Sequence, residues 1–205
     1  MRAELKVFIV DDDPSVRDSL EMMLGLAGYR TASFPDAEAL LEARSDDWSG
    51  CVVTDLRLPG MSGIELQGEL RRRGSALPCV VITAHGDVPS ARAAFQGQAV
   101  DFLEKPFDDV QLRAAIDTAF AQEESRIVRA TARRADSDKL ARLTAREQEV
   151  LECAADGLHA KEIAARLGIS PRTVEVHKTR IMTKLEVRNM AELVRFAVVA
   201  RQARH

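Results

Sequence analysis

Residues 7–14 are Val-Phe-Ile-Val-Asp-Asp-Asp-Pro, an apolar run of four residues that meets three aspartates and a proline. A run with these boundaries predicts a buried β-strand followed at once by a helix. Asp13 suits the N-cap of that helix, and Pro14 suits its first position, where the missing N–H has no intrahelical partner in any case. Asp11 and Asp12 are then left at the carboxyl end of the strand.

The same alternation of short apolar runs and amphipathic segments continues to about residue 120. Apolar residues at three- and four-residue spacing predict the helices, and this order of elements is typical of a parallel sheet built from βαβ units. The predicted strands are 5–10, 29–33, 51–54, 79–83 and 100–104, and the predicted helices are 14–27, 35–44, 62–73 and 88–97, with a fifth that begins near Asp109.

Charged and polar side chains stand at the carboxyl ends of four of these strands. In an open parallel sheet of order 2-1-3-4-5, ligands bind beyond these ends, between the first and third strands. Carboxylates that converge there must take up protons or share a divalent cation, and Mg²⁺ prefers such oxygen ligands. One acidic residue alone could simply cap a helix, but five residues at four strand ends favour a site. They are Asp11, Asp12, Asp55, Thr83 and Lys105.

These residue types suit phosphoryl chemistry. The Asp55 carboxylate could attack a phosphoryl group, with the metal, the Lys105 ammonium and the Thr83 hydroxyl stabilising charge on the transferred oxygens. A magnesium-dependent phosphatase with the same aspartyl intermediate is the alternative from the enzyme class. Such enzymes usually carry a DxDx[TV] loop, whereas Leu56 and Arg57 follow Asp55 here.

Four stretches resemble the receiver domain of two-component response regulators, and His-Gly-Asp-Val within the third resembles its FixJ-type subgroup. The resemblance implies a flavodoxin-like α/β fold and phosphoryl transfer from a sensor histidine kinase to Asp55. The stretches are Ile9–Asp13, Thr54–Gly63, Ile82–Val88 and Val100–Phe107.

The same resemblance implies particular roles. Thr83 and Phe102 would respond to phosphorylation, the hydroxyl moving to the phosphate and the ring turning inward; for Phe102 alone, a plain core aromatic is the alternative. Family members usually carry Gly before the Ala-Val-Asp-Phe run, whereas this chain has Gln98, so the preceding helix is expected to end differently. The implied Mg²⁺ ligands are Asp11, Asp12, Asp55 and the backbone carbonyl of Arg57.

The last third of the chain predicts four short helices and no strand. From Gln122 to Arg142 a composition without Gly or Pro favours a helical connection. We therefore expect a receiver domain at 1–122, a helical linker at 123–140 and an all-α domain at 141–205. The predicted helices of that domain are 144–156, 161–167, 171–185 and 190–201.

The pattern from Leu143 to His177 is similar to the LuxR-type helix-turn-helix, which implies a four-helix domain that binds DNA as a dimer through its third helix. The core side of that helix carries Val174, and His177 beside it is expected to pack. An exposed apolar residue among polar ones suits the major groove, and neighbouring cations suit phosphates. The base-facing candidates are Arg172, Thr173, Glu175, Val176 and Thr179, and the phosphate candidates are Lys161, Lys178, Arg180, Lys184 and Arg188.

Charge supports a polyanionic partner for the second half. Residues 1–124 carry a net charge of −10 and residues 125–205 carry +7, which suits DNA but also a merely solvated basic face. The expected partners are a histidine kinase, promoter DNA and RNA polymerase, with a homodimer after phosphorylation. A constitutive DNA-binding adaptor whose receiver only dimerises is a further alternative.

Three well-separated cysteines without a CxxC pair predict buried, reduced thiols. The N-terminal apolar run is too short for a signal peptide or a membrane span, so a cytoplasmic location without membrane contact is expected. The cysteines are Cys51, Cys79 and Cys153.

Overall fold

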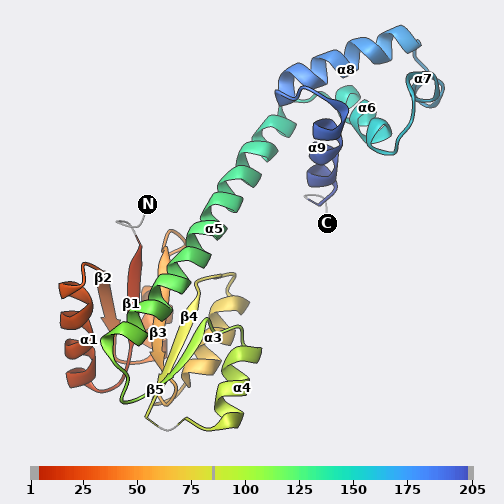
Figure 1. The fold of residues 1–205 in the computed structure, drawn as a ribbon. Helices are drawn as coiled ribbons and strands as arrows, with labels where there is room; N and C mark the ends of the chain where they lie inside the picture. The colour runs from red at the N-terminus through yellow and green to blue at the C-terminus, as the bar shows by residue number, and fades with distance from the viewer. Residues whose placement is uncertain (1–4, 85, 203–205) are drawn as a thin grey trace. The chain divides into compact units, whose positions relative to one another are not determined.

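The computed structural model describes residues 5–84 and 86–202 (Figure 1). His85, part of the stretch that carries the FixJ-type resemblance, lies outside these residues. The chain divides into two compact units, Met1–Ile127 and Val128–His205. The first unit is an α/β domain and the second is helical. In the part of the chain that is described, no helix combines the length and apolarity needed to cross a membrane.

The first unit contains a five-stranded parallel sheet in the order β2-β1-β3-β4-β5, which confirms the predicted fold class. On β1, Val10 lies beside Phe34 of one neighbour and Thr54 of the other. Because the strands are parallel, their carboxyl ends meet at one edge of the sheet. The strands are β1 (Lys6–Val10), β2 (Arg30–Phe34), β3 (Gly50–Asp55), β4 (Cys79–Thr83) and β5 (Asp101–Glu104).

Helices cover both faces of this sheet (Figure 1). Side chains of α1 and α5 are buried against one face, and those of α2, α3 and α4 against the other. The apolar area removed from water on both faces stabilises this arrangement. The helices are α1 (Pro14–Leu26), α2 (Ala37–Ala43), α3 (Gly63–Arg72), α4 (Val88–Gln96) and α5 (Asp109–Ala141).

Side-chain caps fix where these helices begin. Asp13 accepts a hydrogen bond of 2.8 Å from the backbone N–H of Ser15, and Pro14 is the first residue of α1, as predicted. At the start of α3, Ser62 and Glu65 form a capping box. Asp13 is therefore occupied as a cap, which separates it from the two preceding aspartates.

The end of α4 keeps a left-handed residue although Gln98 takes the place of the usual Gly, so the expectation that this helix ends differently is wrong. Gly97 keeps a right-handed conformation, and Gln98 adopts a φ of 64°. The left-handed position thus falls on a residue with a Cβ atom, which costs roughly 1–2 kcal/mol. Glycine would avoid that cost.

The second unit buries one apolar cluster between four helices after α5. Thr144 and Glu147 form the predicted capping box, Gly168 ends α7 with a φ of 66°, and Ser170 caps α8. α5 continues through the segment after Gln122 without a break and contributes residues to both units. The four helices are α6 (Ala145–Ala155), α7 (Ala160–Leu167), α8 (Pro171–Leu185) and α9 (Met190–Gln202).

The three cysteines are free and buried, which confirms the prediction. Burial raises the pKa of the Cys79 thiol to about 12 and also raises the pKa of Cys51. Both thiols therefore stay protonated at neutral pH and pack as small apolar groups.

Replacing Gln98 by glycine tests the strain at the end of α4. Gln98→Gly is expected to raise the free energy of unfolding by roughly 0.5–1 kcal/mol, because relief of the Cβ strain exceeds the entropy that glycine adds to the unfolded chain. The measurement is urea unfolding of the full chain. Arg92→Gly, at an exposed position inside α4, is the control and is expected to lower stability by roughly 0.5–1 kcal/mol. A Gln98→Gly protein less stable than wild type would contradict the conclusion that the left-handed conformation of Gln98 is strained.

Candidate functional site

The carboxyl edge of the sheet brings the predicted polar residues together. Asp11 directly follows β1, Asp55 ends β3 and Thr83 ends β4. The backbone continues this edge: Leu56 N–H donates to the Ile82 carbonyl at 2.7 Å, and Lys105 N–H donates to the Thr83 carbonyl at 2.7 Å. The site therefore rests on hydrogen-bonded strand ends.

Lys105 connects two of the carboxylates. Its Nζ lies 2.9 Å from Asp11 Oδ2 and 3.8 Å from Asp55 Oδ1. The side chains of Asp11, Asp55 and Lys105 are 2%, 14% and 24% exposed, so water screens these charges only partly. Asp11 and Lys105, 94 positions apart in sequence, thus form one partly buried cluster with Asp55.

The Asp55 carboxyl feels this environment directly. Burial raises its pKa above the ordinary value, the Lys105 charge lowers it, and the Asp11 and Asp12 charges raise it again. One lysine does not compensate fully for burial and two acidic neighbours. A further cation at this place would lower the pKa and favour the ionised form.

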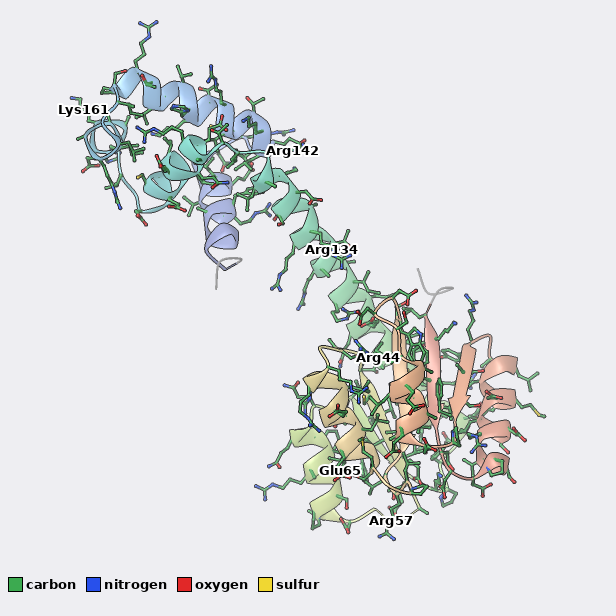
Figure 2. The ribbon with its side chains drawn as sticks, turned by 180° about the vertical axis from the view of Figure 1, so that it is seen from behind. Arg44, Arg57, Glu65, Arg134, Arg142 and Lys161 are labelled. Carbon is green, nitrogen blue, oxygen red and sulfur yellow. The ribbon has the colours of Figure 1, made fainter. Side chains whose placement is uncertain are left out.

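The oxygens of this cluster suit magnesium. Among the described residues, no group of three or more His, Cys, Asp or Glu side chains is arranged to hold a metal ion by itself. Mg²⁺ usually binds one or two protein carboxylates and completes its shell with water or phosphate oxygens. A set of hard oxygens with incomplete charge compensation fits that preference. Figure 2 shows the exposed Arg57 side chain at this edge of the sheet, pointing outward.

Arg17 is a site residue that the sequence argument missed. Its Nη1 donates to the backbone carbonyl of Asp11 at 2.7 Å and to that of Asp12 at 3.1 Å. The guanidinium therefore fixes the backbone of the acidic loop formed by Asp11 and Asp12. A signal existed, because a cation near the amino end of a helix opposes the helix dipole and needs a specific acceptor.

Two further predicted residues lie close to this cluster. Thr83 is 1% exposed at the end of β4. Phe102, on β5, is half-buried and packs on a small cluster that includes Val81 and Ala94. Phe102 thus packs against α4, and β4 lies between its strand and the strand that ends at Asp55.

The second unit presents the predicted surface of α8. Val174, Ile181 and Leu185 are buried in the core. The opposite side is exposed, with Val176 at 44%. The exposed candidates on this side are Arg172, Glu175, Val176, Thr179 and Arg180, with Thr173 half-buried beside them. Lys161 on α7 is exposed, and Figure 2 shows its side chain projecting from the unit.

Two predicted phosphate contacts already have partners. Lys178 Nζ lies 3.3 Å from Glu175 Oε1 on the surface. Lys184 Nζ lies 2.6 Å from Glu147 Oε2, whose side chain is 4% exposed, and donates to the Arg142 carbonyl at 3.1 Å. Burial alone would raise the pKa of Glu147, but hydrogen bonds from Lys184 and Thr144 lower it below the ordinary value. Lys184 therefore holds α8 to α6.

His177 lies half-buried in α8, as the sequence led us to expect. Its Nδ1 is buried without a hydrogen-bond partner among the described residues. The side of the ring that carries Nδ1 therefore packs within the domain.

Two family models match the chain. The response regulator receiver domain matches residues 7–117, and the luxR family of bacterial regulatory proteins matches residues 141–197. The chain therefore belongs to the response regulators that join a receiver domain to a LuxR-type DNA-binding domain. These are phosphorylation-dependent transcription regulators of two-component systems, with histidine kinases and promoter DNA as their partner classes.

Within this family, the chain is similar to regulators of the FixJ type. It is 44% identical to the transcriptional regulatory protein FixJ of Azorhizobium caulinodans over 98% of this chain and 95% of the relative. It is 43% identical to FixJ of Rhizobium meliloti over 94% of both. Among solved structures, the response regulator StyR matches with a TM-score of 0.82 and 42% identity, covering 94% of this chain and 98% of that one. The family match favours this class over the phosphatase alternative.

Removing the Arg17 guanidinium is expected to slow phosphorylation by acetyl phosphate roughly tenfold to a hundredfold. The acidic loop would lose two hydrogen bonds, and a small displacement of the reacting groups lowers the reaction rate by a factor of this size. The measurement is the initial rate of phosphoprotein formation by Arg17→Met. Arg72→Met, which removes an exposed arginine on α3, is the control and should react as wild type does. Equal rates for both variants would exclude a positioning role for Arg17.

Lys184 and Arg180 are expected to behave in opposite ways. Lys184→Met should destabilise the second unit by about 2–3 kcal/mol, because the buried Glu147 loses its cation. This loss of stability is smaller than for a fully buried ion pair, because Lys184 is one-third exposed. Arg180→Met should leave stability unchanged and lower the salt slope of DNA binding by about 1. Guanidinium unfolding and salt titrations measure the two effects.

The Lys184 effect should also depend on pH. The pKa of Glu147 is lowered in the folded state, so the stabilisation is complete above the unfolded-state pKa and is lost as pH falls through the folded-state pKa. The stability difference between wild type and Lys184→Met should therefore shrink in acid. A difference that is constant with pH would show that the lost energy is packing rather than charge.

Proposed function

We propose that Asp55 accepts a phosphoryl group from a sensor histidine kinase in a reaction catalysed by the receiver itself. An Asp55 carboxylate oxygen forms the bond to phosphorus as the bond to the kinase histidine nitrogen breaks. Lys105 is near enough to meet charge on the phosphoryl oxygens, because its ammonium already lies between Asp11 and Asp55. The single observation that carries the proposal is this shared lysine.

Bound Mg²⁺ would supply positive charge for the transferred oxygens. The residues proposed to hold it are Asp11, Asp12, Asp55 and, through its backbone carbonyl, Arg57. Arg17 would keep the Asp11–Asp12 loop in place, since it binds both backbone carbonyls. Before phosphorylation, Lys105 alone would offset part of the repulsion among the carboxylates.

Thr83 and Phe102 are proposed to report the phosphorylated state. The Thr83 hydroxyl belongs to the strand end next to Asp55 and would turn to the phosphate. Phe102 borders a small apolar cluster under α4, so its ring would move inward where the threonine had been. Both movements change the surface near α4, where we propose that two copies of the chain associate.

The proposed organisation is a receiver at 1–122, a helical linker at 123–140 and a DNA-binding domain at 141–205. In a dimer, two α8 helices would enter successive major grooves at half-sites about one helical turn apart. The protein would then act at promoters with RNA polymerase, in the cytoplasm. We propose as DNA contacts Lys161, Arg172, Thr173, Glu175, Val176, Lys178, Thr179 and Arg180, with Lys184 as the weakest contributor because of its internal ion pair.

The test is DNase footprinting of a promoter fragment with and without acetyl phosphate. Wild type should protect the DNA at a lower protein concentration, by at least about tenfold, when the phosphodonor is present, a coupling of the usual size. Asp55→Asn should lose this response and should not form phosphoprotein. Asp46→Asn, at an exposed aspartate of the same unit, is the control that should keep it.

A response that persists in Asp55→Asn would overturn the proposed phosphorylation site. Equal protection by wild type with and without the donor, despite complete phosphorylation, would favour the constitutive adaptor instead.

A further inference from the structure

A cavity of about 600 Å³ opens in the first unit at the amino edge of the sheet, the edge opposite Asp55. It lies between the ends of α3 and α4, the segment before β4, and the part of α5 that precedes Ile127. Its volume is within the range of small-molecule sites. The residues used below are Gln67, Arg71, Gln98, Gln122, Glu123 and Arg126.

Gln67 leaves a polar atom in the wall of this cavity without a partner. The residue is 4% exposed, and its Oε1 is buried with no hydrogen bond to any described residue. Buried amides normally satisfy such an atom. The oxygen is shielded in this conformation, but the last torsion of a glutamine is soft, and rotation of the amide would bring the oxygen to the cavity wall. None of the described residues supplies a donor to it.

The cavity rim carries an uncompensated positive charge. Among the described residues, Arg71 makes no ion pair, and its Nη1 reaches only Gln98 Oε1 at 3.4 Å. By contrast, Glu123 is fully buried and bonds Arg126 through two contacts of 2.6 and 2.7 Å. That pair neutralises itself, which leaves Arg71 available to an anion.

The backbone conformation of Gln98 is an independent indication of a binding site. This residue occupies the left-handed conformation that glycine occupies at lower cost, and its side chain lines the cavity beside Arg71. Strained conformations of this kind gather at binding sites, where a side chain is needed at that position. A polar amide is thus kept at the rim at the expense of local stability.

We propose that this cavity binds a small carboxylate that also carries N–H donors, of the α-amino acid class. Its carboxylate pairs with Arg71, and its N–H groups donate to Gln67 Oε1 and to the amide oxygens of Gln98 and Gln122. An anion without N–H donors leaves Gln67 unsatisfied, and a neutral amide leaves Arg71 unpaired. Both parts of the ligand are therefore required. The site is separate from Asp55 and does not rest on its phosphorylation.

Three probes of graded chemistry test the proposal on the full-length protein by titration calorimetry. L-Glutamine carries a carboxylate and N–H donors, glutarate carries carboxylates without N–H donors, and propionamide carries an amide without a carboxylate. L-Glutamine is expected to bind at least ten times more tightly than either of the others. No measurable binding of L-glutamine at millimolar concentration, or equal binding of glutarate, would overturn the proposal.

Variants then locate the binding. Gln67→Leu and Arg71→Met should each weaken L-glutamine binding at least tenfold, whereas Arg72→Met, at the next residue and outside the cavity, should bind as wild type does. Unchanged affinity in Gln67→Leu would contradict the assigned site. Gly97→Ala gives a second, smaller perturbation should Gln67→Leu not fold, because its Cβ would lie 2.3 Å from Gln67 Oε1 and should displace that amide and weaken binding.

Discussion

The repulsion among carboxylates at one edge of a parallel sheet is the constraint on which the receiver depends. Asp11 and Asp55 are placed side by side because β1 and β3 are neighbours, and both are largely removed from water. Among the described residues, Lys105 is the cation that pairs with both, and the pKa of Asp55 is still raised. Incomplete compensation makes the edge attract further positive charge, and such a place favours an incoming phosphoryl group together with its counter-ion.

Much of this edge was predictable because it follows from local patterns. Short apolar runs gave the strands, and the order of elements gave a parallel sheet, so residues directly after each strand had to share one edge. The caps at Asp13 and Ser170 also depend on neighbours in sequence. Arg17 escaped prediction because its acceptors are backbone carbonyls, which a pattern of side chains does not reveal; the one signal was the unfavourable place of a cation near the amino end of a helix.

The second unit shows a limit of arguments from charge. Arg180 and Lys184 are both cations at the predicted DNA surface, one exposed and one one-third exposed with a buried partner. Lys184 and Glu147 are 37 residues apart in sequence and lie on different helices. Hydrophobic periodicity describes the faces of one helix, so it does not predict which residues of two helices pair. The face that a helix turns to its core was readable from Val174 and Ile181, but the partner that a boundary residue chooses depends on tertiary packing.

Buried charges are paired differently at the two edges of the receiver sheet. At the carboxyl edge, excess negative charge gathers around one lysine, whereas at the amino edge the buried Glu123 is matched by Arg126 and the excess charge is positive. A buried charge is tolerated only when paired. Arg71 is exposed, and its charge would favour a ligand of opposite sign in the cavity beside it. Because Glu123 and Arg126 both belong to α5, their ion pair lies within that helix, and apolar packing is what holds this part of α5 against the sheet. Any group that binds beside that pair contacts the helix that joins the two units.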